Sequence, residues 1–590
     1  MIDSGKIPII VGVTGHRNIV DEDKPEIKAR VIDSLKEIQS LCKGDDGNGT
    51  PVIMLNAFAQ GADMLCAEAA FELGIDVIAV LPREEKKYAE SFDDLEDKNK
   101  LFDYLAKCKR KIVAPDIEKN KDWLRKQNEQ MDDDSYEYRQ LGIYIAEHSH
   151  VLIALWDGKQ PRDRFGCGTV EVIKFALEHN FLDKDHLFKP GTINDSAVVW
   201  IKSRRQGDGA QADVQKKWLI SSLEKGGGNL GDDTFDAPPQ FLKEIISKTV
   251  KYNASNVDIP RESNNLWGNA DELDEYRKNV EYHYAKADAL TCKKNQKRYN
   301  MFLLLIAIIG TIVACSFLIY DEVSLPFMIF PCSLAVGAII VLCYVGRKKA
   351  YHKNYVEYRA FAEALRIQFY LSMCLKEKDI VTNVGDLYSW AQKIDSTWID
   401  KAIRAIAVIS AVCENQPSTT DVVEAWIGKR EGTGQLGYHF RKKNTHQKNA
   451  KKYAILTKAF RCVAVVMYFV IFAFEVVACI LKACGVDWFW EGNAFAYVSW
   501  RNVCAIVLGV SAAGSLLFSS YWGKLSFDRK LEDNEKMCEF YSSAYARWNE
   551  AKTHPNGEVE KFVKEIAREE IVENGIWCSY VKDNTLEVNI

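Results

Sequence analysis

The chain has 590 residues, of which 47% are hydrophobic and 27% are charged, and its net charge is −5. This length exceeds what one hydrophobic core normally serves, so several domains are expected. The slightly acidic balance argues against direct nucleic-acid binding. The 16 cysteines follow no disulfide or metal-ligand spacing and several lie in apolar runs, so we expect reduced thiols that pack as small hydrophobic groups, and no metal site.

Strand and helix patterns alternate through the first 250 residues. Short apolar runs predict strands at 9–13, 52–55, 77–81, 151–156 and, as the last one, 198–201. Helical patterns lie between them at about 25–40, 61–73, 138–148 and 169–179. Short apolar strands that alternate with helices are typical of a parallel sheet covered on both faces. The expected fold class is therefore an N-terminal α/β Rossmann-like domain with a parallel sheet.

Four loops of this domain should follow the carboxyl ends of strands, where open α/β sheets bind ligands. The loop that contains Gly166 and Gly168 leads directly into the helix predicted at 169–179. The free backbone amides and the dipole at the start of a helix favour binding of a phosphate. Asp63 opens another helix, where it either caps the helix or binds a ribose hydroxyl. Each loop alone is also compatible with an ordinary turn, so the prediction of a ligand site depends on all of them meeting at one edge. The candidate ligand-binding residues are Thr14, Gly15, His16, Arg17, Gly61, Asp63, Arg83, Gly166, Gly168, Thr169 and Glu171.

The second half of the chain contains four long apolar segments with almost no charge. They are Met301–Tyr320, Leu325–Val345, Cys462–Leu481 and Val503–Trp522. Each has about the twenty residues that a bilayer crossing needs, so we expect an all-α region with four transmembrane helices in two hairpins. Basic residues flank the outer ends of both hairpins, whereas acidic and aromatic residues occupy the links. The positive-inside rule then predicts that both termini and the central region are cytoplasmic.

Four polar residues stand out within these segments. Glu475 lies in the middle of the third, where an acid is costly and should face protein or water. In the fourth segment Ser511, Ser515 and Ser519 recur every four residues. The serines either support close packing of helices or line a pore that forms when several copies assemble.

Four motifs occur in order within the N-terminal 250 residues: "VGVTGHR", "NAFAQGADMLCAEAAFELGIDVIAVLP", "SHVLIALWDG" and "GCGTVEVIKFAL". With these motifs, this region resembles the SLOG superfamily of Rossmann-like nucleotide-binding domains. The resemblance implies a nucleotide site that uses the glycines, Arg17, Asp63, Thr169 and Glu171 named above. Related LOG phosphoribohydrolases carry P-G-G-x-G-T-x-x-E, whereas Phe165 replaces a glycine here and Glu171 comes one position early. Because a catalytic arginine is also missing, with Arg139 only a poor substitute, ligand sensing is favoured over hydrolysis.

The membrane region resembles SLATT domains, which are two-crossing effector units. The stretches "AYHKNYVEYRAFAEALRIQFYL" and "WIGKREGTGQLGYH" carry this resemblance. The implied organisation is a SLOG-like domain at 1–250, a linker and helix at 251–290, and two SLATT-like units at 291–440 and 441–590. Within the first stretch, Arg359, Glu363 and Arg366 have helical spacing, which fits either a solvated ladder of ion pairs or a surface that couples sensor to membrane.

Together these resemblances imply an oligomeric effector of bacterial antiphage defence in the inner membrane. Its cytosolic domain would sense a nucleotide or NAD-derived second messenger, and its membrane part would permeabilise or depolarise the bilayer in abortive infection. The expected partners are the messenger, the lipid bilayer and further copies of the chain, and no cofactor is expected. Two alternatives remain open: a membrane-tethered nucleotide phosphoribohydrolase or NAD-processing enzyme with Glu171 as its weak catalytic candidate, and a passive membrane scaffold.

Overall fold

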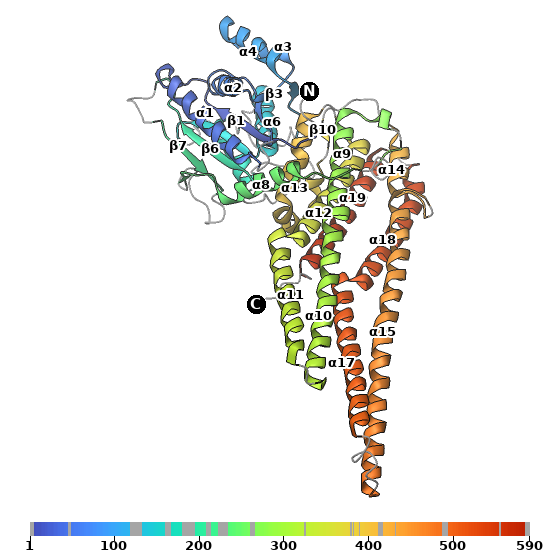
Figure 1. Ribbon diagram of the computed structural model, residues 1–590. Coiled ribbons are helices and arrows are strands. Elements are labelled where there is room, and N and C mark those ends of the chain that lie inside the picture. The colour runs from blue at the N-terminus through green and yellow to red at the C-terminus, as the bar shows by residue number, and fades with distance from the viewer. Residues whose placement is uncertain are drawn as a thin grey trace. The chain divides into compact units, whose positions relative to one another are not determined.

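The computed structural model divides the chain into two compact units (Figure 1). Unit 1 comprises residues 1–286, 361–419 and 563–575, and unit 2 comprises residues 287–360, 420–562 and 576–590. The residues that the structure describes are 5–44, 49–117, 132–159, 167–179, 195–207, 214–221, 230, 234–259, 266–268, 270–323, 326–377, 380–381, 383–388, 390–410, 417–430, 432–485, 494–553 and 556–583.

An eight-stranded sheet organises unit 1, with the strand order β4-β3-β2-β1-β5-β6-β7-β8. Six strands are parallel, namely β4 (Arg110–Val113), β3 (Asp76–Leu81), β2 (Val52–Asn56), β1 (Ile9–Gly15), β5 (Val151–Trp156) and β6 (Ala197–Lys202). The chain runs outward from β1 through β4 and then returns to the opposite side of β1 with β5. The order therefore reverses between β1 and β5, which is the topological switch point of a Rossmann-like fold. The predicted fold class is confirmed.

The far edge of the sheet differs from the sequence-based expectation. The predicted strand at 198–201 is not the last, because β7 (Lys216–Leu219) pairs antiparallel with β6, and β8 (Thr234–Phe235) pairs antiparallel with β7. These short strands and β4 had no clear signal in the sequence. β4 and β7 each begin with two basic residues and β8 has only two residues, so these strands lack the apolar run that marks a central strand.

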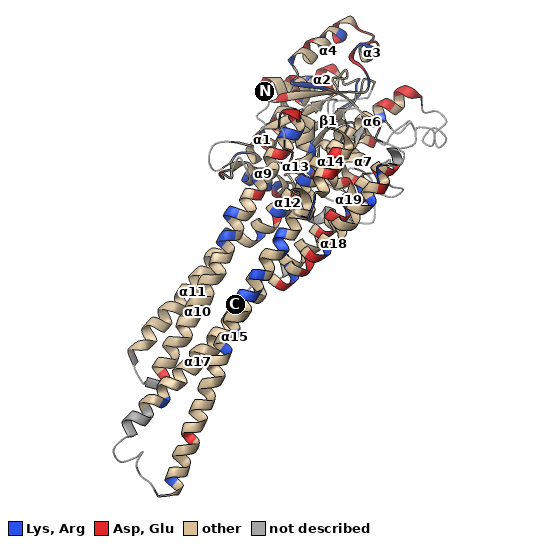
Figure 2. Ribbon diagram, turned by 90° about the vertical axis from the view of Figure 1, so that its right-hand side faces the viewer, with Lys and Arg blue, Asp and Glu red and all other residues tan. Residues whose placement is uncertain are grey.

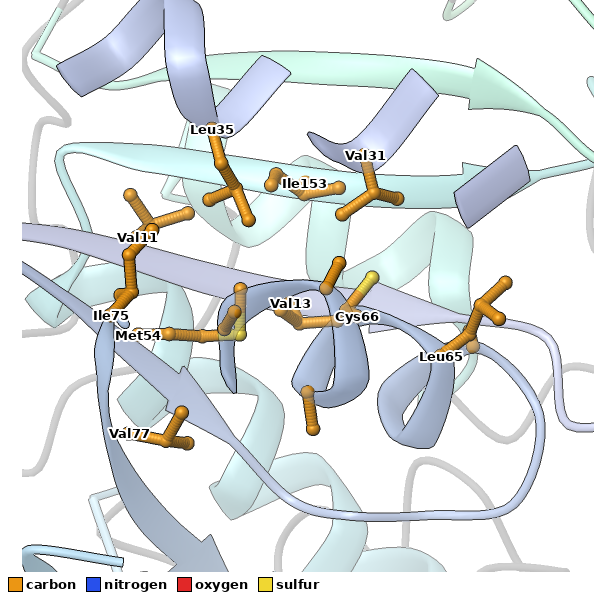
Figure 3. Close-up of a cluster of buried hydrophobic side chains, with 14 of the residues drawn as sticks. Val11, Val13, Val31, Leu35, Met54, Leu65, Cys66, Ile75, Val77 and Ile153 are labelled. Carbon is orange, nitrogen blue, oxygen red and sulfur yellow. The ribbon is translucent and has the colours of Figure 1, made fainter. Parts of the chain in front are cut away.

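Helices cover both faces of the sheet (Figure 1). They are α1 (Lys24–Leu41), α2 (Ala62–Glu72), α3 (Glu85–Ala89), α4 (Leu95–Lys107), α6 (Asp133–His148), α7 (Thr169–Glu178) and α8 (Gln240–Ala254), with a short 3-10 turn, η1 (Asp21–Asp23). Figure 3 shows Val11 and Val13 of β1 with Val31 and Leu35 of α1 and Cys66 of α2 in one buried cluster. Those side chains fill one face because alternate residues of a strand point the same way.

The opposite face of β1 carries α6. Gly12 makes this close approach possible, since a Cβ there would lie 2.3 Å from Ser149 Oγ and 2.7 Å from Ile145 Cγ2. Gly142 has a similar role on α6, where a Cβ would lie 2.7 Å from Val172 Cγ2 of α7. Helices α6 and α7 therefore pack closely beside each other, and both begin at the carboxyl edge of the sheet.

Unit 1 also recruits segments from much later in the chain. They are α9 (Glu275–Ala289) up to residue 286, α12 (Tyr351–Cys374) from residue 361, the hairpin of β9 (Lys376–Glu377) and β10 (Ile380–Val381), η6 (Val384–Leu387), α13 (Trp390–Ile409) and part of α19 (Asn556–Asp583), together with the turn η3 (Ala270–Glu272). Buried ion pairs hold α12 to α19 here: Arg366 contacts Glu363 of its own helix and lies 3.2 Å from Glu570. Glu363 and Arg366 are buried, so they do not form a solvated ladder.

Unit 2 contains two long helical hairpins. The first consists of the π-helical turn η4 (Leu290–Gln296), α10 (Lys297–Val323), the turn η5 (Pro326–Met328) and α11 (Ile329–Lys349). The second consists of α15 (Gly434–Ala483) and α17 (Ala494–Leu525), flanked by α14 (Thr419–Ile427) and α18 (Phe527–Ala551). Helix α17 packs against both α10 and α15. A Cβ on Gly509 would lie 2.5 Å from Leu318, which explains why a small residue stands at this crossing.

The four predicted apolar segments fall on α10, α11, α15 and α17, although Leu325 lies outside the described residues. These four helices are long and apolar enough to cross a membrane. Figure 2 shows that charged residues are sparse along them and gather toward one end of each hairpin. Many large apolar side chains on these helices are exposed, including Phe330, Leu334, Phe469 and Leu516. An apolar surface of this kind suits lipid contact, so these four helices could span a membrane.

Candidate functional site

A cavity of about 730 Å³ opens at the carboxyl edge of the sheet in unit 1. Its walls come from the loop after β1, the loop after β2, the start of α6, and the segment between β5 and α7. These elements surround the switch point between β1 and β5. The volume lies within the range of small-molecule sites in proteins, and the position is where open α/β sheets bind ligands.

Most of the candidate residues chosen from the sequence meet at this cavity. Those that line it are Thr14, Gly15, His16, Arg17, Asp63, Gly168, Thr169 and Glu171. Gly61 and Arg83 do not line it, and Gly166 lies outside the described residues. The separate loops therefore converge on one edge, which is the condition on which the prediction of a ligand site depended.

Gly61 does not line the cavity but packs against the backbone of the loop after β1, which does. Its φ of +78° falls in a region that side-chain-bearing residues rarely adopt. A Cβ at this position would lie 2.1 Å from the carbonyl oxygen of Arg17. Glycine is required here because the β1 loop rests directly on the backbone that starts α2. Ala62 N donates a hydrogen bond to His16 O at 3.1 Å, which fixes the same contact.

His16 connects the β1 loop to the β5–α7 segment. Its Nε2 accepts a hydrogen bond from Asp157 N at 3.2 Å and lies 3.3 Å from the Asp157 carboxylate. Its Nδ1 lies 3.5 Å from Thr169 Oγ1 at the start of α7. Because the ring is buried and contacts both walls, it positions the loops as well as lining the cavity.

Asp63 is the buried acid of the site. It accepts a hydrogen bond from Ala59 N at 3.3 Å, and it is nearly inaccessible to solvent. Burial raises its pKa to about 7, although the Ala59 amide and the Arg17 guanidinium both act to lower it. Removing a carboxylate from water penalises its charged form, so Asp63 changes its protonation near neutral pH.

Two arginines lie close to the same tyrosine ring, but their charges are compensated differently. The guanidinium carbons of Arg17 and Arg83 lie 5.0 Å and 5.7 Å from the centre of the Tyr138 ring. Arg83 also pairs with Asp134 at 2.8 Å and with Glu137 at 2.7 Å. Arg17 has no carboxylate partner of this kind among the described residues, so its charge is available to a ligand.

The start of α7 already faces an acid of its own. Gly168 precedes the first turn of the helix and, as a glycine, has no side chain that could cap it. Glu171 lies in the first turn, and its Oε2 would be 3.2 Å from a Cβ placed on Gly168. A carboxylate at this place interacts favourably with the helix dipole. The site that the sequence assigned to a phosphate is therefore partly occupied by Glu171.

Several lining residues were not predicted from the sequence. They are Tyr88, Asp134, Ser135, Tyr138, Asp157, Lys159, Cys167 and Arg205. The signal used in the sequence was glycine-rich loops after strands, and most of these residues have no such signature. Tyr88 lies on α3 and Tyr138 on α6, and only the tertiary fold brings them beside Arg17. Among the described residues, no cluster of three or more His, Cys, Asp or Glu side chains suits a metal ion.

The polar residues of the apolar helices are spread over different environments. Ser511 and Ser515 are buried, whereas Ser519 is exposed. A Cβ on Gly514 would lie 3.2 Å from the Phe460 ring, so this part of α17 packs closely on α15. Within one protomer the first two serines therefore serve helix packing, and they do not share one accessible stripe with Ser519. Glu475 of α15 is half-buried and has no ion pair in the described part of the chain.

A protein-family model described as a protein of unknown function, DUF4231, matches residues 283–378. The match spans the end of α9, the first hairpin and α12, and it does not include the residues of the cavity. No curated protein matches the chain.

Proposed function

We propose that this chain is a ligand-gated membrane effector. The cavity of unit 1 binds a nucleotide or NAD-derived signal, and binding leads the apolar helices of unit 2 to permeabilise or depolarise a membrane. The observation that carries this proposal is the presence, in one chain, of a ligand-sized cavity at a Rossmann-like switch point and four helices suited to a bilayer. The resemblance to SLOG and SLATT domains adds the biological setting, a bacterial antiphage defence that acts at the inner membrane.

Helix α6 is the element best placed to carry the signal away from the cavity. It lines the cavity with residues from Asp134 to Ile145, and it also contacts α13. Arg404 of α13 lies 3.4 Å from the Glu147 carboxylate. Lys401 Nζ donates hydrogen bonds to the carbonyl oxygens of Glu147 and Ser149, at 3.3 Å and 2.9 Å. A ligand that shifts α6 therefore acts on buried charged contacts, which favour discrete arrangements over gradual ones.

From α13 the contacts continue to helices that have residues in both units. Gln392 Nε2 donates a hydrogen bond to Ile571 O of α19 at 2.7 Å, and α19 is joined to α12 by the pair of Arg366 with Glu570. Helices α12 and α19 each contribute residues to unit 1 and to unit 2. A shift in α13 can thus be passed along continuous backbone toward α11.

Dye leakage from liposomes tests the proposal directly. Full-length protein in vesicles loaded with a self-quenching dye should release it only when the right member of a panel is added, the panel being cyclic di- and trinucleotides, ADP-ribose and its cyclic isomers. Gly168→Trp should abolish the response, because the ring fills the cavity and the backbone there is in an ordinary extended conformation. Gly268→Trp is the matched control, since a Cβ there meets nothing within 4 Å. Leakage that does not depend on any of the ligands, or ligand-dependent leakage that persists in the Gly168→Trp variant, would contradict the proposal.

A second candidate function is hydrolysis of an N-glycosidic bond. The observation in its favour is Asp63, a buried acid in the cavity with a pKa of about 7, because catalytic acids and bases work best near the operating pH. Asp63 is a better candidate than Glu171, whose carboxylate lies against the start of α7. Chromatography of NAD and nucleoside monophosphates after incubation with the protein separates the two functions, and turnover that disappears in Asp63→Asn would support the enzyme.

A further inference from the structure

The cavity has two ends, and the charged side chains at one end have partners of opposite charge or dipole, whereas the arginine at the other end has no ion pair among the described residues. At one end the start of α7 faces Glu171, and His16 and Asp157 already bond to each other. At the other end the guanidinium of Arg17 lies over Tyr138 with no carboxylate partner among the described residues. A ligand anion at the first end would meet a carboxylate, whereas an anion at the second end would meet a guanidinium that makes no ion pair among the described residues.

A second, independent observation points to the Arg17 end. The Tyr88 side chain is fully buried and lines the cavity, and its hydroxyl has no hydrogen-bond partner within the described residues. An unpartnered buried hydroxyl is unfavourable in the free protein and becomes favourable when a ligand accepts its proton. Burial first, and then the Asp63 and Tyr138 side chains, raise the pKa of this hydroxyl well above its ordinary value, so it stays a donor.

We propose that the Arg17 end of the cavity, with Tyr88 and Tyr138, binds a phosphate group of the ligand, and that the start of α7 does not. This inference rests on the proposed function and specifies how its ligand is held. The guanidinium supplies several donors in a planar arrangement that matches a phosphate, and the Tyr88 hydroxyl supplies another from below. The remainder of the ligand then extends along the cavity toward Thr169 and Lys159.

The environment of Asp63 is compatible with an anion beside it. Its carboxyl faces Arg17 and the Ala59 amide, with Tyr88 and the thiol of Cys66 as its other titratable neighbours. Because burial raises the pKa of this carboxyl to about 7, it is mostly protonated below that pH and then presents a hydrogen-bond donor instead of a second negative charge. The Asp134 carboxylate, which also lines the cavity, is paired with Arg83, so an anion beside Arg17 meets less repulsion than Glu171 creates at the start of α7.

Inorganic phosphate is the probe that tests this assignment. Full-length protein in detergent micelles at pH 6.5 should broaden the phosphorus NMR signal of millimolar phosphate. Arg17→Ala should weaken this binding at least tenfold, and Arg17→Lys should restore part of it because the charge returns without the planar group. Arg17 is exposed, so the variant should fold. Lys159→Ala, which removes a lining cation beside Asp157, should weaken phosphate binding far less than Arg17→Ala does.

Tyr88→Phe gives a signature that a purely structural role would not produce. The variant should weaken phosphate binding several-fold, while the melting temperature of the ligand-free protein stays equal or rises because an unsatisfied buried hydroxyl is gone. The assignment is overturned if the wild type binds no phosphate, or if Lys159→Ala weakens binding and Arg17→Ala does not. The latter result would move the phosphate to the start of α7 and leave the proposed function intact, since ligand-dependent leakage tests that function separately.

Discussion

At the scale of single residues, Asp63 gives the chain a measurable pH dependence. Its pKa is 3.8 in an unstructured chain and about 7 in the folded protein, mainly because of burial. Between these values the folded state binds more protons than the unfolded state, so stability falls as the pH rises from about 4 to about 7 and is then constant.

The variant Asp63→Asn removes this dependence while keeping an acceptor for the Ala59 amide. Relative to this variant, the wild type should lose about 4 kcal/mol between pH 4 and pH 8, since each pKa unit corresponds to about 1.4 kcal/mol. Thermal unfolding of both proteins across that range measures the effect, and the exposed Asp33→Asn serves as the control. Parallel pH profiles for the wild type and Asp63→Asn would show that the carboxyl ionises normally.

Gly61 and Gly74 both have a strained backbone conformation, but only Gly61 also lacks room for a side chain, so comparing them separates the two effects. Both have positive φ, at 78° and 67°, but a Cβ on Gly61 would lie 2.1 Å from Arg17 O, whereas a Cβ on Gly74 meets nothing within 4 Å. Gly74→Ala should cost about 1 kcal/mol for the left-handed conformation alone. Gly61→Ala should cost more than twice as much and also abolish ligand binding, because the β1 loop must move. Melting curves and ligand titrations of both variants test this, and equal losses would argue against the close contact.

At the scale of elements, strands and helices with a clear local pattern were predicted from the sequence. Contacts between segments that are far apart in the chain were not. Strands β1, β2, β3, β5 and β6 are apolar runs bounded by glycine, proline or polar residues, so their ends were predicted within about two residues. The same logic found the four apolar helices. Nothing local indicates that α13 and parts of α12 and α19 pack with the N-terminal sheet, because their apolar faces fit many partners. For the same reason Tyr88 and Tyr138 were missed, and the ionisation of Asp63 depends on a burial that no motif records.

The junction of α6 with α13 yields a prediction at this scale. Arg404 is buried and lies 2.8 Å from Asp386, 3.0 Å from Asp400 and 3.4 Å from Glu147. Arg404→Met should destabilise unit 1 by about 3–5 kcal/mol, because it leaves carboxylates buried without their counter-charge.

The double variant Glu147→Gln with Arg404→Met separates stability from coupling. It removes one of the orphaned charges and should recover part of the stability. If α6 transmits the signal, the double variant should still bind ligand but leak less dye in response. Recovery of stability together with wild-type leakage would show that this junction is structural only.

At the scale of the whole molecule, the candidate ligand cavity and the four apolar helices belong to different units. Unit 1 contains a cavity at the point where the strand order of the parallel sheet reverses. Unit 2 contains helices with exposed apolar side chains, whose contact with water would be unfavourable. Four helices enclose little space when α17 packs against α10 and α15 through Gly509 and Gly514. A conducting path would then need several copies of the chain, which agrees with the burial of Ser511 and Ser515 inside one protomer.

The distribution of basic residues makes the membrane topology testable. The outer ends of both hairpins carry the lysines and arginines, so those ends should stay in the cytoplasm while the links cross the membrane. Alkaline phosphatase is active only outside the cytoplasm, so fusions after Val323 and after Gly485 should be active, and fusions after Lys353 and Ile590 inactive. A fluorescent protein that matures only in the cytoplasm should give the reverse pattern at the same four sites. Replacing Lys293, Lys294, Lys297 and Arg298 by glutamine should weaken the bias of the first hairpin and leave that of the second. Phosphatase activity at Ile590 with none at Gly485 would show that the second hairpin has the opposite orientation and would contradict the predicted topology.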